Sequence, residues 1–154
     1  MADSHEDDVV DRLAGIAPDS PLAALRARRP EARQHTQASH RVLLDPSVPG
    51  GLTLGERAAV ARRVAELNAD PALTAHYAAL LADSGEAPSP RLTALLRHVD
   101  RLTLEPRAAT PADLDALRAA GLGEREIVTL SQLVAFANHQ VRMLAGLRLL
   151  GAAA

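Results

Sequence analysis

The chain of 154 residues contains no cysteine, and it contains no lysine either, since all 17 of its basic side chains are arginines. The absence of cysteine excludes a disulfide framework, an iron–sulfur cluster, a zinc site with thiolate ligands and any thiol redox chemistry run by this chain alone. The absence of lysine excludes Schiff-base chemistry and a P-loop, because both need an amine side chain. These two absences remove several large classes of enzyme.

Aromatic side chains are also scarce, because Tyr77 and Phe136 are the two that the sequence holds. Alanine and leucine supply most of the 47% hydrophobic content. Both residue types favour helices, and few β-branched or aromatic residues remain to form strands. The composition therefore predicts an all-α protein.

Neither the charge nor the hydropathy of the chain indicates a nucleic acid or a membrane as its partner. A net charge of −2 with a pI near 6.3 is the wrong balance for a general nucleic-acid binder. No uninterrupted apolar run approaches the roughly 18 residues that a membrane span needs. The first eight residues are acidic, opposite in charge to the start of a signal or transit peptide. We therefore expect a cytoplasmic protein.

Proline, glycine and capping residues divide the chain into about seven to eight expected helices. The strongest start signal is Thr53, because Glu56 follows three residues later and completes a capping box. The expected helices run from Ser4 or Asp3 to Gly15, from Ser20 to Pro30, from Pro30 to Leu44, from Thr53 to Asn68, from Asp70 to Gly85, from Arg91 to Leu102, from Thr110 to Gly121, and from Gly123 onward. We expect residues 1–50 to form a helical extension packed on a core of residues 51–154, within one compact domain.

Histidines are the groups that titrate near neutral pH, and His76 is the strongest candidate for a catalytic role. It lies beside Tyr77 in the first turns of the helix that Asp70 begins, so one interpretation is a general base oriented by a carboxylate. The other interpretation is a partly buried helix residue with no chemical role. His98 lies among charged residues and is expected to be solvated, and His40 does not share a helix face with the histidine five residues before it. No spacing is typical of a metal site, so we predict no metal and no cofactor.

Two polar residues flank the apolar stripe of the last helix, Asn138 and Arg142, four residues apart. An arginine near a core face needs a partner, because an unpaired buried charge is costly. One interpretation is a salt bridge from Arg142 to Glu56 or Glu66. The other is a ligand site in which Arg142 binds a carboxylate through two hydrogen bonds.

Two stretches of the chain carry a recognisable pattern of residues. The first consists of Leu54–Arg57, Arg63–Val64, Leu67–Pro71 and Ala75–Tyr77, and the second of residues 113–122, 126–127, 134–138, 142 and 146–147. Together they resemble the carboxymuconolactone decarboxylase and alkylhydroperoxidase-D-like superfamily. The resemblance covers residues 52–150, and residues 8–44 look like the extension of a subgroup described only as carboxymuconolactone decarboxylase domain proteins. It implies an all-α, alkylhydroperoxidase-D-like helical bundle that forms a homo-oligomer, with a small organic acid or lactone as ligand.

The chain departs from the peroxidases of this superfamily at every catalytic position. Those peroxidases carry a glutamate, then a Cys-x-x-Cys motif, then a histidine four residues after the second cysteine. In the alignment the glutamate falls on Ala58, the two cysteines fall on Asp70 and Leu73, and the histidine falls on Tyr77. His76 stands one residue early, about 100° away around the helix. Without a thiol, the peroxidatic nucleophile and its resolving partner are both missing.

Two functions follow from this comparison of motifs. The first is a non-catalytic helical oligomer that has lost the redox site and binds a small organic ligand. The second is an active enzyme with decarboxylase-like proton transfer, in which Asp70, His76 and Tyr77 form the catalytic group and Asn138 and Arg142 bind the ligand. A peroxidase label given by family membership would then describe the ancestry of the chain and not its mechanism.

Overall fold

The computed structural model describes residues 8–45 and 51–152, and every regular element within these ranges is a helix. The described residues form α1 (Val9–Ala14), α2 (Pro21–Ala27), α3 (Pro30–Leu44), α4 (Leu54–Leu67), α5 (Pro71–Ser84), α6 (Pro90–Leu104), the short 3-10 helix η1 (Pro106–Ala108), α7 (Pro111–Ala119) and α8 (Glu124–Ala152). The predicted all-α class is confirmed, with eight α-helices in this part of the chain.

Capping residues set the helix boundaries, largely as their sequence pattern predicts. The Thr53 hydroxyl accepts the Glu56 N–H at 3.0 Å, and the Thr53 N–H donates to the Glu56 carboxylate at 2.9 Å, which completes the capping box of α4. The predicted helix that ends at Gly15 is present as α1, but its start differs, because the N-cap is Asp8, whose carboxylate accepts the N–H groups of the second and third helical residues. The predicted caps Ser4 and Asp3 lie outside the described residues.

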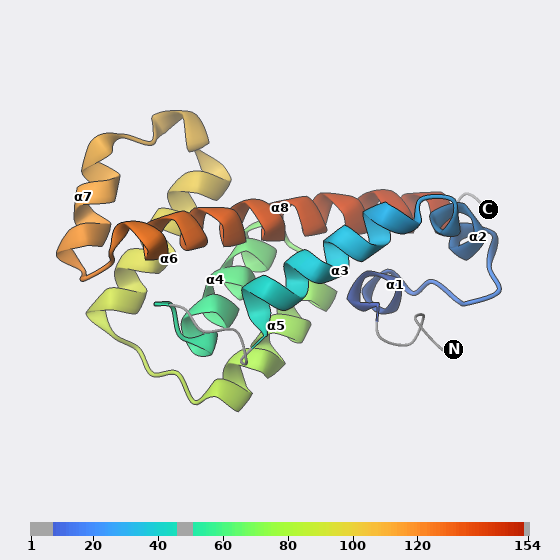
Figure 1. Cartoon of the computed structure of the whole chain (residues 1–154), viewed down its shortest axis with the longest axis horizontal. Coiled ribbons are helices and arrows are strands. Elements are labelled where there is room, and N and C mark those ends of the chain that lie inside the picture. Colours follow the sequence, from blue (N-terminus) through green and yellow to red (C-terminus); the bar gives the residue numbers. More distant parts are fainter. Residues whose placement is uncertain (1–7, 46–50, 153–154) are drawn as a thin grey trace.

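The long helix α8 runs through the whole molecule, and α1, α2, α3, α4 and α6 pack against it (Figure 1). Near its first half lie α6 and α7, and α4 packs against α5, α6 and α8 at once. The helices α1, α2 and α3 all contact α8, and α1 and α2 lie near its C-terminal end.

The core consists mainly of leucine, valine and alanine, as the scarcity of aromatic residues dictates. Val60 and Val64 of α4 are fully buried, which confirms the predicted apolar stripe of this helix. Their fully buried neighbours from the other central helices are Leu73, Tyr77, Leu95, Val99, Leu130, Leu133 and Leu144. Each such burial stabilises the fold by roughly 2 kcal/mol before conformational entropy is subtracted.

A buried cluster of charges ties the first three helices together. Arg33 of α3 donates to Asp11 at 3.0 Å and to Asp8 at 3.3 Å, so it links α3 to the start of α1. Arg26 of α2 forms an ion pair with Asp11, and its side chain is 9% exposed. Within the described residues, these two arginines face two aspartates, and the pairing of opposite charges allows them to be buried.

His98 of α6 is buried at 6% exposure, so the prediction of a solvated residue is wrong. Burial lowers the pKa of His98, against the opposite effect of Asp113, and its Nδ1 atom has no hydrogen-bond partner among the described residues. The charged neighbours Arg97, Asp100 and Arg101 suggested that His98 is exposed, but its side chain faces the core.

None of the described helices combines the length and the apolar character needed to cross a lipid bilayer.

Candidate functional site

Asp70 stands at the start of α5 and is committed to structural contacts. Its carboxylate accepts the Leu73 N–H at 2.9 Å as the N-cap of the helix, and it accepts a hydrogen bond from Arg148 Nη1 at 2.6 Å. Arg148 also donates to the Leu13 carbonyl, so the pair joins α5, α8 and the end of α1. Burial alone would raise the pKa of Asp70, but the hydrogen bonds from Arg148 and Leu73 outweigh it and hold that pKa below its ordinary value.

Tyr77 is fully buried, with its side chain directed at α8. Its hydroxyl donates to the Gln140 Oε1 atom at 2.5 Å. Burial raises the pKa of Tyr77 above its ordinary value, although the hydrogen bond to Gln140 acts in the opposite direction. The tyrosine is therefore neutral near pH 7. The Gln140 Nε2 atom is buried and has no hydrogen-bond partner among the described residues.

His76 belongs to a cluster of rings that four helices bring together. Its imidazole lies 4.9 Å from the Tyr77 ring and 6.0 Å from the His40 ring of α3, measured between ring centroids. The His40 ring lies 6.3 Å from the Phe136 ring of α8 in an edge-to-face arrangement. From α1, Arg12 Nη2 approaches His76 Nδ1 to 3.5 Å. We call Arg12, His40, His76 and Phe136 the imidazole cluster.

Both imidazoles of this cluster are neutral at pH 7. Burial, the neighbouring His76 and the Arg12 charge lower the pKa of His40 to about 4. Burial and Arg12 also lower the pKa of His76 below its ordinary value. Because a guanidinium has donors only, His76 Nδ1 must act as the acceptor of the contact with Arg12. The proton of neutral His76 then resides on Nε2.

The Nε2 atoms of both histidines are buried and have no hydrogen-bond partner among the described residues. Such atoms are rare in folded proteins, and they indicate either an ordered water or a bound molecule. A protonated Nε2 on His76 is a hydrogen-bond donor, which makes it a poor metal ligand. In the part of the chain that the structure describes, no group of three or more potential metal-ligating residues occurs.

The two predicted ligand-binding residues of α8 lie in different surroundings. Asn138 is buried, and its side-chain amide donates to Val134 O and Thr103 Oγ1 while its oxygen accepts from Asn68. Arg142 is exposed and makes no hydrogen bond or ion pair with any described residue. The structure thus brings together His76 and Tyr77 of the predicted set.

The interpretation of Arg142 as the partner of Glu56 or Glu66 is wrong. Glu56 pairs with Arg91 at 2.6 Å, and Glu66 pairs with Arg62 at 2.8 Å. Arg142 follows Gln140 by two residues, and two residues turn a helix by about 200°, so Arg142 faces solvent while Gln140 faces the core.

Sequence reasoning missed His40 and Arg12 as neighbours of His76, and Arg148 as the partner of Asp70. His40 was considered only against a nearby histidine in sequence, whereas its structural neighbours are 36 and 96 residues away along the chain. The sequence around His40 did not indicate its burial, because α3 has few apolar residues. These contacts exist only because α1, α3, α5 and α8 meet.

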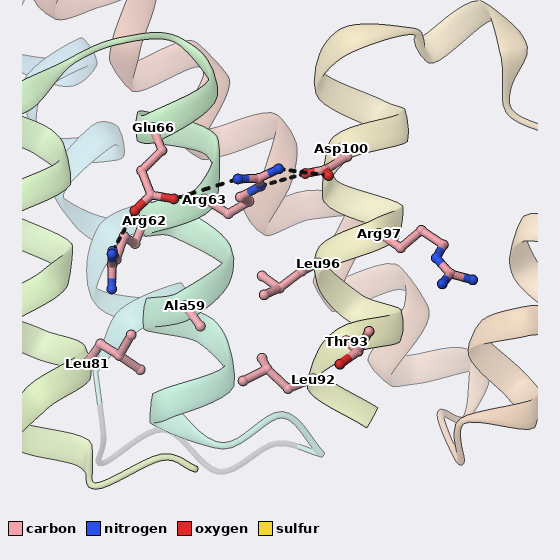
Figure 2. Close-up of a pocket in the computed structure, with 10 residues that line it drawn as sticks. All are labelled: Ala59, Arg62, Arg63, Glu66, Leu81, Leu92, Thr93, Leu96, Arg97 and Asp100. Atoms are coloured by element: carbon pink, nitrogen blue, oxygen red, sulfur yellow. Dashed lines mark hydrogen bonds and ion pairs between the residues drawn. The ribbon is translucent and has the colours of Figure 1, made fainter. Parts of the chain in front are cut away.

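A separate groove of about 500 Å³ lies between α4, α5 and α6 (Figure 2). Ala59, Leu81, Leu92 and Leu96 line its apolar part. At one end, a row of ion pairs closes it, from Arg62 through Glu66 and Arg63 to Asp100. None of the five predicted site residues lines this groove.

Comparison with known proteins finds a similar fold at low sequence identity. No protein-family model and no curated protein matches the chain. Among solved structures, it is similar to an uncharacterized peroxidase-related protein from Silicibacter sp. TM1040, with a TM-score of 0.59 and 18% sequence identity. The alignment covers 75% of this chain and 68% of that chain. At this identity, the likeness shows that the two proteins share a fold.

Proposed function

We propose that this chain is a cysteine-free member of the carboxymuconolactone decarboxylase and alkylhydroperoxidase-D-like superfamily that is not a thiol peroxidase and that binds a small organic molecule. The sequence resemblance and the peroxidase-related neighbour in fold both support the assignment. At the two aligned cysteine positions stand Asp70, held by Arg148, and Leu73, fully buried in the core. Neither side chain is able to reduce a hydroperoxide.

The observation that carries ligand binding is the pair of buried Nε2 atoms on His40 and His76 without partners among the described residues. Two neutral imidazoles offer directed hydrogen bonds, and the rings of Tyr77 and Phe136 offer flat apolar surface beside them. Arg12 is exposed and touches His76, so the cluster is reached from the surface. We assign the ligand, an organic acid or a lactone, to this cluster.

A second candidate is an enzyme that transfers a proton with His76. The lowered pKa of His76 favours it, because a neutral imidazole at pH 7 is the form that accepts a proton. Asp70, its predicted partner, already holds Arg148 and the start of α5, so in this candidate Asp70 positions the helix. The predicted ligand contact of Arg142 remains a prediction for both candidates.

The thiol-peroxidase part of the proposal is tested with an organic hydroperoxide and dithiothreitol as reductant. We expect consumption of the hydroperoxide at the rate of a control without protein. Turnover that depends on both protein and thiol would overturn the proposal and the alignment on Asp70 and Leu73.

The binding part is tested by NMR titration of the full chain with a panel of small carboxylic acids and lactones. We expect the side-chain resonances of His40 and His76 to shift on binding, while those of exposed His139 stay unchanged. His76→Ala should abolish the shifts of His40, whereas His139→Ala should preserve them. A panel that leaves both cluster histidines unperturbed contradicts the proposal. Turnover of a lactone that is lost in His76→Ala would favour the enzyme.

A further inference from the structure

Resting on the proposed ligand role of the imidazole cluster, we infer that the ligand is an organic anion whose carboxylate is bound between the Arg12 guanidinium and the imidazoles of His76 and His40, so that Arg12 determines specificity for the acid over a neutral analogue. The proposal decides between the two ligand classes that the resemblance leaves open. It rests on the charges around the cluster and on its unpartnered donors.

The charges that face the cluster are all positive or neutral. Arg12 comes from α1, His40 from α3, and His76 with the neutral Tyr77 from α5, while α8 contributes Phe136. No carboxylate among the described residues forms an ion pair with Arg12, His40 or His76. Among the described residues, the cluster therefore has one permanent positive charge, that of Arg12, and no carboxylate paired with it.

The arginines that hold the rest of the fold together have a different kind of partner. Arg148 meets Asp70, Arg91 meets Glu56, and Arg63 meets Asp100. Arg12 instead approaches the uncharged edge of an imidazole. A carboxylate is the group that a guanidinium binds best, because its two oxygens match the guanidinium donors.

The unpartnered donors point to the same class of ligand. With Nδ1 of His76 facing Arg12, the Nε2 proton is a buried donor that lacks an acceptor among the described residues. Nε2 of His40 lacks a partner as well. A carboxylate carries only acceptors, so it matches the two donors of the cluster, the Arg12 guanidinium and the Nε2 proton of His76. A lactone also accepts hydrogen bonds, but it leaves the charge of Arg12 without a counterpart.

Binding of an anion at this position should be coupled to proton uptake by the histidines, whereas binding of a neutral molecule should not. The Arg12 charge is one cause of the low pKa of both histidines, and a bound carboxylate offsets that charge. The pKa of each imidazole then rises on binding, so the complex takes up protons from solution. Affinity for the acid is therefore expected to increase as the pH falls below 7, whereas affinity for a neutral analogue is not.

The test uses benzoate and benzamide as matched planar probes, with inorganic phosphate as a third probe, in NMR titrations of the full chain. We expect benzoate to bind at the cluster histidines about tenfold more tightly than benzamide at pH 6.5. Arg12→Gln should remove this preference, and Arg12→Lys should restore part of it. The matched control is Arg107→Gln in η1, which removes an exposed arginine far along the chain and should leave the preference intact.

Each other outcome is decisive. If benzoate and benzamide shift His40 and His76 with equal affinity and Arg12→Gln changes neither, the anion inference is wrong while the proposed binding function stands. If phosphate binds as tightly as benzoate and loses affinity in Arg12→Gln, the site takes inorganic oxyanions and the organic-acid inference is wrong. If no probe perturbs either histidine, the inference and the site assignment fail together.

Discussion

At the scale of single residues, the charged groups inside this protein act mainly by joining helices that are distant in sequence. Asp70 is an instructive case, because the sequence marks it correctly as the start of a helix and assigns it a catalytic role besides. In the structure, its carboxylate accepts hydrogen bonds from the Leu73 N–H and from Arg148, which lies 78 residues further along the chain. The cap could be predicted from an Asp-Pro pair, whereas the ion pair depends on where α8 ends.

Two substitutions of Asp70 separate its contributions. Asp70→Asn keeps a good capping side chain but removes the charge that Arg148 needs, so it should lower the free energy of unfolding by about 2 kcal/mol. Asp70→Ala removes the cap as well and should cost about 1 kcal/mol more. Urea unfolding followed by circular dichroism measures both values. Equal stability of Asp70→Asn and the unmodified chain would show that the Arg148 pair contributes nothing.

At the scale of elements, α2, α4 and α7 begin where local chemistry predicts, because their caps are made by residues close in sequence. The capping box of Thr53 and the Ser20 cap of α2 are both present, and the Thr110 N–H donates to Asp113 at the start of α7. The start of α1 was predicted wrongly because several acidic and hydroxyl residues compete there. Asp8 caps the helix and also pairs with Arg26 of α2 and Arg33 of α3, contacts that the sequence does not reveal.

The buried charge cluster of α1, α2 and α3 predicts a weak point in the fold. Arg33→Met removes the hydrogen bonds from Arg33 of α3 to Asp8 and Asp11, and it takes one cation away from these two carboxylates. We expect backbone amides in residues 9–44 to exchange with deuterium about tenfold faster, while amides of α4 and α5 are unchanged. Hydrogen exchange with mass spectrometry measures this.

The control for that experiment is Arg28→Met, which removes an exposed arginine at the end of α2. It should leave the exchange rates of α1 and α3 as they are. Uniform acceleration over the whole chain in Arg33→Met would mean that the extension and the core unfold as one unit.

At the scale of the whole molecule, composition predicts the class of fold and leaves the site undetermined. A chain rich in alanine and leucine forms helices whichever way they pack, so the all-α class follows from residue content. The imidazole cluster requires four helices to meet at one point, and no residue spacing encodes that meeting. For the same reason the sequence singled out His76 but did not find His40 or Arg12.

Acid should weaken the fold in two stages. His40, His76 and His98 remain neutral in the folded protein, because their pKa values are lowered, while in the unfolded chain they take up protons below about pH 6.5. The unfolded state then binds more protons, so stability falls from about pH 6.5 down to about pH 4, by roughly 3 kcal/mol for His40 alone. Asp70, whose folded pKa is lowered, contributes its loss only as the pH falls further.

Thermal unfolding at a series of pH values checks this expectation. His40→Gln removes the group with the pKa of about 4 and should flatten the dependence between pH 6.5 and pH 4. His35→Gln, on the exposed side of the same helix, should preserve it. A melting temperature that is constant from pH 7 to pH 4 would contradict the assigned burial of the three histidines.

The homo-oligomer that the resemblance implies is also a property of the whole molecule, and it stays a prediction. Exposed apolar side chains on α8, Val128 and Leu149, are the kind of surface that a second copy covers. Analytical ultracentrifugation of the full chain should give a multiple of 16.2 kDa. A mass of one chain at every concentration would contradict it.

The hydrogen bond between Tyr77 and Gln140 links α5 to α8, and it limits which substitutions these two positions accept. Their hydrogen bond forms at one rotation of the long helix only, so it selects a single register among the many that a leucine-rich surface would accept. Replacing either residue alone strands a polar atom in the core, whereas replacing both with apolar side chains of similar size strands none. Relatives of this protein are therefore expected to change the two positions together, with phenylalanine opposite an aliphatic side chain as the alternative pair.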